Sequence, residues 1–220
     1  MKIINNIAIL ENDTHISKWV IESGRLDHDQ NMLPFILANI KAGDVVIDAG
    51  AYIGDHTIAY AERVGKDGFV FAFEPNKEAF DCLEYNLKTF DNTTIFNQGL
   101  GSKIEKMGML KSPDNIGMCH LIKGGDITVT TIDDLYLFKC DFIKIDCEGY
   151  ELEILKGGYE TIRRFKPTLL IELNKYTLER EGITFKHIFN FLDNIGYIYN
   201  NIYEEQDLNQ PQIDIICRPK

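Results

Sequence analysis

The chain has 220 residues, of which 45% are hydrophobic, so it can bury one substantial core and is expected to form a single domain over residues 1–220. Its formal net charge of −11 argues against sequence-independent binding to nucleic acid, where neutralisation of phosphates dominates the affinity. No segment approaches the roughly 20 uninterrupted apolar residues that a membrane span needs, so a membrane protein is not expected.

The first elements predicted along the chain are a strand and a helix. Residues 1–10 alternate around two asparagines, which is typical of a strand, and they lack the apolar core and cleavage site of a signal peptide. Residues 29–40 carry a helical stripe of apolar side chains, with Pro34 in the first turn, where proline is tolerated. We interpret residues 1–40 as an N-terminal strand and helix that cover the domain.

A regular alternation of strands and helices begins at residue 44. Strands are predicted at 44–48, 69–75, 93–98, 141–146 and 168–173, and helices at 55–64, 76–90, 131–138, 150–165 and 184–195. This rhythm predicts an α/β domain with a parallel sheet and helices on both faces. The chain ends with two further strands, 197–203 and 212–218, which we expect to form an antiparallel hairpin.

Residues 99–130 interrupt this alternation. The segment contains glycines and lysines and has no helical period. It is typical of a pair of short strands, or of a loop, lying over one end of the sheet. We interpret it as an insertion that covers the active site.

The first buried strand ends at Asp48 and is followed by Gly50 and Gly54, after which a helical pattern begins. In an open α/β sheet, ligands bind outside the carboxyl ends of the strands, so this loop belongs to the site. A dinucleotide fingerprint, G-x-G-x-x-G, would need glycine where Tyr52 and Asp55 stand. NAD and FAD are therefore a poor fit.

The spacing of this loop suits a ligand that has a nucleoside but no phosphate, such as S-adenosylmethionine. Its ammonium would be attracted by Asp48, and its carboxylate by the free N–H groups at a helix start. Glu74 ends the next strand, 24 residues after Gly50, close to where an acidic side chain accepts hydrogen bonds from ribose hydroxyls. The alternative is that the glycines serve strand–helix packing and that Glu74 is a surface carboxylate.

Five segments, in this order, resemble the FkbM family of S-adenosylmethionine-dependent methyltransferases: 44-DVVIDAGAYIGDHT-57, 70-VFAFEPN-76, 130-TTIDDL-135, 142-FIKIDCEGYELEILKG-157 and 169-LLIEL-173. The resemblance covers about residues 40–175 and is most specific in the fourth segment. It implies a three-layer, Rossmann-like class I methyltransferase fold, with a mostly parallel seven-stranded sheet that ends in an antiparallel hairpin.

The resemblance also implies where S-adenosylmethionine is held: by the first loop, by the end of the second strand, by the turn after the third strand and by the end of the fourth. The residues implied are Asp48, Gly50, Ala51, Tyr52, Gly54, Glu74, Pro75, Asn76, Gly99, Leu100 and Asp146. Tyr52 and Gly99 depart from the asparagine and alanine that the family often carries there, and neither forbids the cofactor. His56 follows the first loop and is a candidate cofactor contact, with exposure on a helix surface as the alternative.

Methyl transfer to an alcohol is an in-line displacement that also needs a general base for the hydroxyl proton. Asp146 and Glu148 follow the fourth strand and are the candidates, because paired carboxylates can raise one pKa towards neutrality. The alternatives are that Asp146 only orients the cofactor and that Glu148 only caps the following helix. His120 is a third candidate base, with a surface histidine as its alternative.

A metal-assisted reaction is a further alternative. Asp146 and Glu148, together with Asp126 or Glu172, could hold Mg²⁺ through oxygen ligands and acidify a hydroxyl. No spacing in the sequence demands such a site, so no metal ligand is predicted.

The sequence therefore predicts an S-adenosylmethionine-dependent methyltransferase. The resemblance implies O-methylation of a hydroxyl on a small molecule or glycan, and the alternatives are N-methylation and a catalytically inactive nucleoside-binding module. The five cysteines contain no CxxC pair and suggest neither a disulfide framework nor a zinc site, so a cytoplasmic protein is expected. The sequence does not decide between a monomer and a homodimer.

Overall fold

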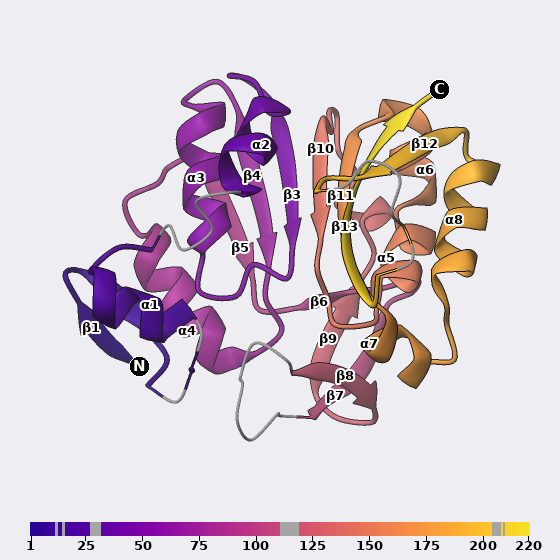
Figure 1. The fold of residues 1–220 in the computed structure, drawn as a ribbon. Helices are drawn as coiled ribbons and strands as arrows, with labels where there is room; N and C mark the ends of the chain where they lie inside the picture. The colour runs from indigo at the N-terminus through magenta and orange to yellow at the C-terminus, as the bar shows by residue number, and fades with distance from the viewer. Residues whose placement is uncertain (12, 15, 27–31, 111–118, 204–207, 209) are drawn as a thin grey trace.

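The computed structural model describes residues 1–11, 13–14, 16–26, 32–110, 119–203, 208 and 210–220 (Figure 1). Its central sheet has seven strands: β3 (Val45–Ala49), β4 (Phe69–Phe73), β5 (Thr93–Phe96), β10 (Phe142–Ile145), β11 (Thr168–Asn174), β12 (Tyr197–Asn201) and β13 (Gln212–Pro219). Their order is β12-β13-β11-β10-β3-β4-β5. The strands β5, β4, β3, β10 and β11 pair in parallel, and β13 is antiparallel to both of its neighbours.

Helices cover both faces of this sheet and make three layers (Figure 1). One face carries α2 (Met32–Ala38), α3 (Asp55–Val64) and α4 (Lys77–Leu87), and the other carries α5 (Glu151–Gly157), α6 (Tyr159–Phe165) and α8 (Phe185–Asn194). Because side chains alternate along a strand, Val46 packs with α2 and α3, whereas its neighbour Ile47 packs with α5 and α8. The predicted seven-stranded fold with a C-terminal antiparallel hairpin is confirmed.

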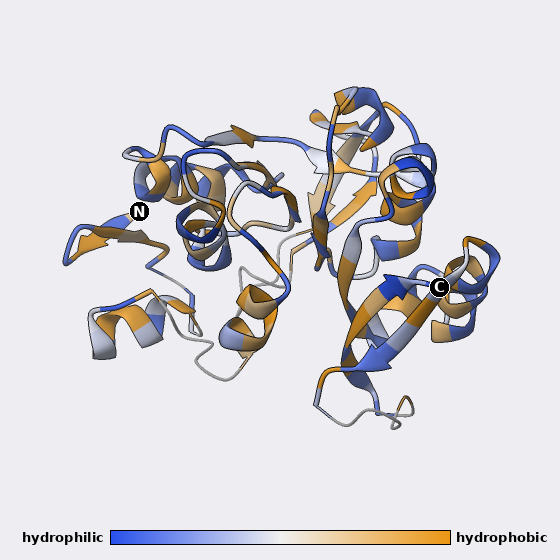
Figure 2. Ribbon diagram, turned by 90° about the horizontal axis from the view of Figure 1, so that it is seen from above, coloured by the Kyte–Doolittle hydropathy of each residue, from blue (hydrophilic) through white to orange (hydrophobic). Residues whose placement is uncertain are grey.

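The hydropathy of the elements follows this layering. Figure 2 shows helices that carry both hydrophobic and hydrophilic residues around the strands of the sheet. Strand β10 is buried at every position, as expected for a parallel strand covered on both faces. Among the helices in the described part of the chain, none has the length and apolar character that crossing a bilayer requires.

The insertion predicted at 99–130 forms a second, smaller sheet next to the carboxyl ends of the central strands (Figure 1). It contains β6 (Gly99–Leu100), β7 (Glu105–Leu110), β8 (His120–Lys123) and β9 (Ile127–Thr130), in the order β6-β9-β7-β8. The segment was expected to form a pair of short strands or a loop, whereas its described residues form four strands. These strands have two to six residues, too few for an alternation to stand out in the sequence. Residues 111–118 of the predicted insertion lie outside the described residues.

The predicted strand over residues 1–10 is wrong at its centre. Strands β1 (Lys2–Ile4) and β2 (Ile7–Ile9) pair antiparallel, and Asn5 and Asn6 form the turn between them. Both asparagines have positive φ, 47° and 65°, as a two-residue type I′ hairpin turn requires. Asparagine tolerates this conformation better than other side chains, so the two asparagines mark a turn.

The N-terminal hairpin is attached to α4 by two side chains, Asn86 and Tyr85, and the Tyr85 hydroxyl donates to Asn6 Oδ1 at 3.0 Å. Asn86 Oδ1 accepts the Ala8 N–H at 2.7 Å, and Asn86 Nδ2 donates to the carbonyl oxygens of Ala8 at 3.0 Å and Ile53 at 2.8 Å. Helix α1 (Ile16–Ser23), which was not predicted, follows the hairpin and has only Ser17 and Val20 buried. For the predicted helix at 29–40, the structure describes α2 from Met32 onward, with Pro34 in its first turn as expected.

Two further predictions in the C-terminal half need correction. The helix predicted at 150–165 is divided into α5 and α6 at Gly157 and Gly158. A Cβ on Gly157 would meet the Gly101 carbonyl oxygen at 1.8 Å, so the small sheet packs directly on this break. The helix predicted at 131–138 is only a 3-10 turn, η2 (Asp133–Leu135).

Helix α7 (Lys175–Arg180) follows β11 and was not predicted. It begins where Asn174 Oδ1 accepts the Tyr176 N–H at 3.0 Å, a side-chain cap that favours a helix start. With six residues, it is too short to show a helical stripe.

Candidate functional site

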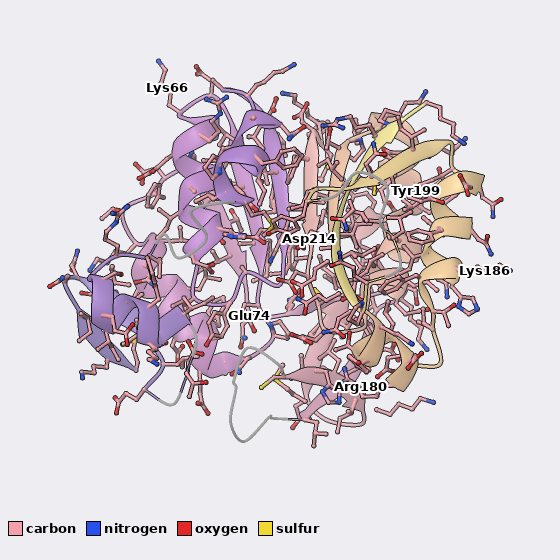
Figure 3. The ribbon with its side chains drawn as sticks, in the orientation of Figure 1. Lys66, Glu74, Arg180, Lys186, Tyr199 and Asp214 are labelled. Carbon is pink, nitrogen blue, oxygen red and sulfur yellow. The ribbon has the colours of Figure 1, made fainter. Side chains whose placement is uncertain are left out.

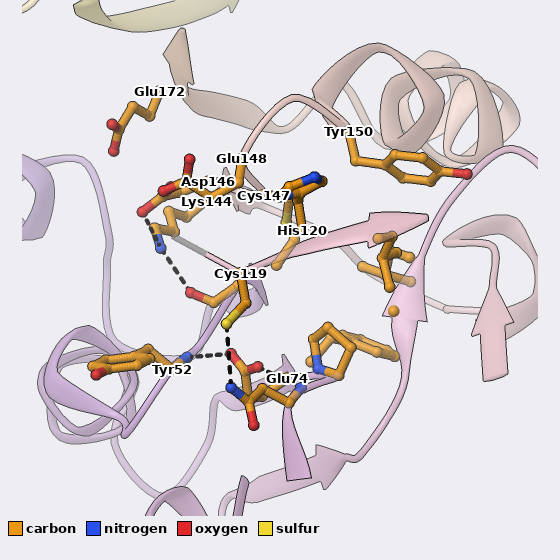
Figure 4. Close-up of a pocket in the computed structure, with 18 of the residues that line it drawn as sticks. Tyr52, Glu74, Cys119, His120, Lys144, Asp146, Cys147, Glu148, Tyr150 and Glu172 are labelled. Atoms are coloured by element: carbon orange, nitrogen blue, oxygen red, sulfur yellow. Dashed lines mark hydrogen bonds and ion pairs between the residues drawn. The ribbon is translucent and has the colours of Figure 1, made fainter. Parts of the chain in front are cut away.

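A pocket of about 330 Å³ lies at the carboxyl ends of β3, β4 and β10 (Figure 4). Its lining comes from the central sheet, the N-terminal segment and the small sheet. The N-terminal segment contributes Asp13, Ile16 and Met32, and the small sheet with its preceding residue contributes Met109, Cys119, His120 and Leu121. Figure 3 places Glu74 centrally, whereas Lys66 lies at the opposite end of the sheet. The pocket therefore occupies the place where open α/β sheets bind their ligands.

Gly50 allows two parts of the pocket to touch. Its φ is +84°, and a Cβ there would lie 1.9 Å from the carbonyl oxygen of Asp146. The first loop (residues 50–54) and the β10 turn (residues 146–150) are therefore in backbone contact, which only glycine permits. The N–H groups of Gly50 and Ala51 donate to the Phe73 carbonyl oxygen at 3.1 and 3.0 Å and fix the loop to the end of β4.

Glu74 is a buried carboxylate held by two backbone donors. Oε2 accepts the Tyr52 N–H at 2.8 Å and Oε1 accepts the Asn76 N–H at 2.7 Å, and only 7% of the residue is exposed. Burial raises the pKa of Glu74 to about 7, against the effect of these two hydrogen bonds. Each carboxylate oxygen has a further lone pair, so Glu74 can accept hydroxyl donors from the pocket. The surface-carboxylate alternative is wrong.

Lys144 connects the first loop to the β10 turn. Its ammonium donates to the Gly50 carbonyl oxygen at 3.0 Å and lies 3.1 Å from Asp146 Oδ2 and 3.7 Å from Asp48 Oδ1. Only 7% of Lys144 is exposed. Burial alone would lower the pKa of Lys144, but the carboxylates of Asp146 and Asp48 raise it well above the ordinary lysine value, so the ammonium is charged.

Asp48 lies beneath the pocket and does not appear in its lining. It is fully buried, and Oδ2 accepts the Thr57 hydroxyl at 2.6 Å. Burial raises the pKa of Asp48, and Lys144 opposes this rise. The side chain therefore acts on the pocket through Lys144. Ala51 and Gly54 are also outside the lining, and Gly54 starts α3 with φ +93°.

Three carboxyl groups gather at the ends of β10 and β11: Asp146, Glu148 and Glu172 (Figure 4). Burial raises the pKa of Glu148 to about 7, with Asp146 adding to the shift. The charge on Asp146, followed by burial, raises the pKa of Glu172 to about 9. Glu148 and Glu172 differ in pKa, which is the arrangement expected where one group accepts a proton.

The turn before α5 is ordered by Glu151, and the N-cap residue Tyr150 makes no side-chain capping hydrogen bond. Glu151 Oε1 accepts the N–H groups of Cys147 at 3.1 Å and Gly149 at 3.0 Å and so orders the β10 turn. Glu148 has φ +53°, a left-handed conformation that is uncommon outside glycine and is typical of functional turns. Its carbonyl oxygen accepts a hydrogen bond from Arg180 Nη2 at 2.5 Å, while its carboxyl group lines the pocket.

The predicted histidines both line the pocket. His120 is half-buried at the start of β8. The sulfur of the preceding residue, Cys119, accepts a hydrogen bond from Asn76 Nδ2 at 3.8 Å. His56 lies on α3 with 8% of its surface exposed, so its alternative as an exposed helix residue is wrong. Its Nε2 is 3.9 Å from Asp55 Oδ2.

The remaining predicted cofactor residues Tyr52, Pro75, Asn76, Gly99 and Leu100 all line the pocket. Asp126, one alternative metal ligand, is exposed in the turn before β9 and lies outside the lining. Within the ranges that the structure describes, no group of three or more His, Cys, Asp or Glu side chains has an arrangement suited to a metal ion.

Sequence reasoning missed Lys144 and the pocket residues of the N-terminal segment. The signal for Lys144 was present, because a lysine in the middle of the buried strand 142-FIKI-145 requires carboxylate partners. The register supplies one, since Lys144 stands beside Asp48 in the β10–β3 pair. For Asp13, Ile16 and Met32 the sequence carried no signal, because their place depends on how the N-terminal segment folds back over the sheet.

Comparison with known proteins agrees with this geometry. The family model described as "Methyltransferase FkbM domain" matches residues 48–199. The hexuronic acid methyltransferase AglP of Haloferax volcanii is 33% identical over 137 residues, which cover 59% of this chain and 56% of that protein. The chain thus spans little more than half of that curated relative.

Two crystal structures show the same fold. Methyltransferase FkbM from Methylobacillus flagellatus has a TM-score of 0.57 and 22% identity, over 79% of this chain and 43% of that one. An S-adenosylmethionine-dependent O-methyltransferase from Thermotoga maritima has a TM-score of 0.56 and 15% identity, over 91% of this chain and 69% of that one. The site residues from Asp48 to Glu172 all fall within the family match, and the chain belongs to the FkbM methyltransferase family.

Proposed function

We propose that this chain is an S-adenosylmethionine-dependent O-methyltransferase that acts on a hydroxyl of a small molecule or glycan. The observation that carries the proposal is the pairing of Gly50 and Glu74 at one pocket. Gly50 lines the pocket without a side chain, and Glu74 presents a buried carboxylate whose remaining lone pairs can accept hydroxyl donors. This combination fits a ribose without a neighbouring phosphate.

The residues present fit this cofactor. Glu74 would hold the ribose hydroxyls, the backbone of residues 98–100 would border the adenine, and the first loop with the β10 turn would border the methionine part. The cofactor supplies a methyl group on a positively charged sulfur. The carboxylates of Glu74 and Asp146 make the pocket favourable for that charge, because Lys144 is already paired.

The acceptor hydroxyl would be placed by the carboxyl groups at the ends of β10 and β11. Glu148 is the proposed general base, because a pKa of about 7 suits proton removal near neutral pH. Asp146, held by Lys144 at 3.1 Å, would orient the hydroxyl, and His120 on the facing small sheet is a second candidate base. The similarity to the hexuronic acid methyltransferase of Haloferax volcanii supports a sugar acceptor.

Calorimetric titration with S-adenosylmethionine, S-adenosylhomocysteine and NAD⁺ tests the cofactor. We expect both sulfur compounds to bind, and Glu74→Gln to weaken them at least about tenfold, because a charge-assisted hydrogen bond is lost. Glu78→Gln, on the surface of α4, is the matched control and should leave the affinity unchanged. Binding of NAD⁺ alone would overturn the proposal.

A panel of sugars and hydroxylated small molecules, incubated with the enzyme and S-adenosylmethionine, tests the reaction. Mass spectrometry should find a methyl group on oxygen, and Glu148→Gln should slow its formation by about a hundredfold, the usual contribution of a general base. A methyl group on nitrogen would point to N-methylation. Cofactor binding without transfer to any member of a broad panel would favour a nucleoside-binding module.

A further inference from the structure

Lys144 lines the pocket between the first loop and the β10 turn. It comes from the interior of β10, yet its ammonium reaches the carbonyl oxygen of Gly50 in the first loop and the carboxylate of Asp146 in the β10 turn. Both partners line the pocket. A single buried side chain therefore links the loop on the proposed cofactor side to the carboxylate on the proposed acceptor side.

The contact to Gly50 uses a backbone acceptor that the loop itself does not satisfy. The Gly50 N–H is fixed to β4 through Phe73, while the Gly50 carbonyl oxygen takes its hydrogen bond from Lys144. Gly50 also has φ +84°, a conformation that an unrestrained loop would exchange with others. The ammonium thus fixes the loop from the carbonyl side.

The third partner, Asp48, compensates the charge in the core. Asp48 is fully buried, lies 3.7 Å from the ammonium and is held by Thr57. A lysine carrying a charge at this depth needs such a partner, because an isolated buried charge is strongly unfavourable. Asp48 pairs with Lys144 on the side away from the pocket. The other two partners of Lys144, Gly50 and Asp146, line the pocket.

We propose that Lys144 is a positioning residue of the site: it fixes the Gly50 carbonyl and the Asp146 carboxylate relative to each other, and Asp48 serves to keep its ammonium charged in the core. The effect on ligand binding rests on the proposed function, whereas the effect on the two loops does not. Lys144 acts through Gly50 and Asp146 and is not itself expected to touch the reacting atoms.

The test uses a charge-balanced variant. Lys144→Met alone leaves Asp48 buried without its cation and is expected to fold poorly, so Asp48→Asn is combined with it. The double variant keeps the volume and the Thr57 hydrogen bond while removing the ammonium. Lys139→Met is the matched control, because Lys139 binds the Gly43 carbonyl oxygen at 2.8 Å and two carboxylates at the opposite end of the same strands.

Two measurements separate positioning from general stability. Amide hydrogen exchange of the ligand-free protein should become about tenfold faster in residues 50–54 and 146–150 of the double variant, with the central strands unchanged. Calorimetry well below the melting temperature should show S-adenosylhomocysteine bound about tenfold more weakly, because the loop must then be ordered on binding. Adding Asp146→Asn to the double variant should weaken binding by less than it does in the wild type.

The outcomes are distinct. Unchanged exchange in both loops, or the same change in Lys139→Met, would overturn the proposed role of Lys144. Wild-type affinity in the double variant would do the same. If wild-type protein binds neither sulfur compound, the proposed function fails, and hydrogen exchange alone then decides whether Lys144 positions the loops.

Discussion

Two lysines join β3 to β10, one at each end of the pair, with nearly the same contacts. At the amino ends, Lys139 donates to the Gly43 carbonyl oxygen at 2.8 Å and lies 3.6 Å from Asp44 and 3.1 Å from Asp141. At the carboxyl ends, Lys144 binds one carbonyl oxygen and two carboxylates at 3.0, 3.7 and 3.1 Å. The side chain of Lys139 is 49% exposed and that of Lys144 is 8% exposed.

Burial of the lysine, and not the set of contacts, decides what such a cluster does. Water and salt screen the exposed cluster, and either partner can be solvated when the other is removed. In the buried cluster Lys144 and Asp48 have no such replacement, so removing the ammonium leaves Asp48 unpaired, whereas the Asp146 side chain is 34% exposed. A cluster with these constraints holds its neighbours in one geometry, which is useful at a binding site and unnecessary at the opposite end.

The largest expected effect is on the buried cluster. Lys144→Met should lower the free energy of unfolding by about 3–5 kcal/mol, because it leaves Asp48 as an uncompensated buried charge. Urea denaturation followed by circular dichroism measures this loss. Adding Asp48→Asn should restore most of the stability. A loss below about 1 kcal/mol would mean that the buried and exposed clusters are equivalent.

The pH dependence of stability should also come from the buried end. Glu74 has its pKa raised by burial to about 7 from 4.5, so the folded state holds this proton more tightly than the unfolded state. This contribution is fully present below about pH 4.5 and is lost as the pH rises through about 7. Urea denaturation between pH 5 and 8 should show stability falling by up to about 3 kcal/mol from Glu74 alone.

Glu148, whose pKa is also about 7, changes stability in the same direction. Glu74→Gln should flatten the pH dependence, whereas Lys139→Met should keep its full slope over this range. If the free energy of unfolding has the same pH dependence in wild type and Glu74→Gln, the pKa of Glu74 is not raised by burial.

A smaller effect is expected where Thr57 holds Asp48. Thr57→Val keeps the shape of the side chain but removes the hydroxyl that donates to Asp48 Oδ2 at 2.6 Å. Losing one hydrogen bond to a buried charged acceptor should cost about 2 kcal/mol, measured by urea denaturation. A change within about 0.5 kcal/mol would show that Lys144 alone satisfies Asp48.

The smallest effect is expected at the exposed end. Lys139→Met should change the free energy of unfolding by less than about 1 kcal/mol, because exposed ion pairs contribute little. High salt should abolish even this difference, since screening removes the interaction in wild type. Thermal unfolding at low and high salt checks both statements, and a loss comparable to that of Lys144→Met would remove the distinction between the two clusters.

The central sheet could be predicted from the sequence because its strands are buried on both faces and read as apolar runs separated by helical stripes. The order of these strands was not predicted and follows from their pairing in the structure. The helix at 150–165 was continuous in its pattern, and its break at Gly157 depends on the small sheet packing against it. The turn at Asn5 and Asn6 was visible as a dipeptide but was read as part of a strand.

The candidate site was predicted less completely. Glu74 and Gly50 were placed by their spacing after neighbouring strands, which is a local property. The position of Asp48 beneath the pocket depends on Lys144, and the meeting of these side chains depends on the register between β3 and β10. Contacts of this kind join residues 96 apart in sequence, and a single sequence shows no local pattern for them.

Asn86 has a consequence for how the chain is made. It holds the backbone of Ala8, and the two residues are 78 positions apart. At roughly 5–20 residues per second, a ribosome would take about 4–16 s to add that distance. During this interval the apolar strand Ile7–Ile9 lacks α4, and the N–H and carbonyl oxygen of Ala8 lack their Asn86 partner. The N-terminal hairpin is thus synthesised before α4, and its hydrogen bonds to Asn86 form only after α4 has emerged.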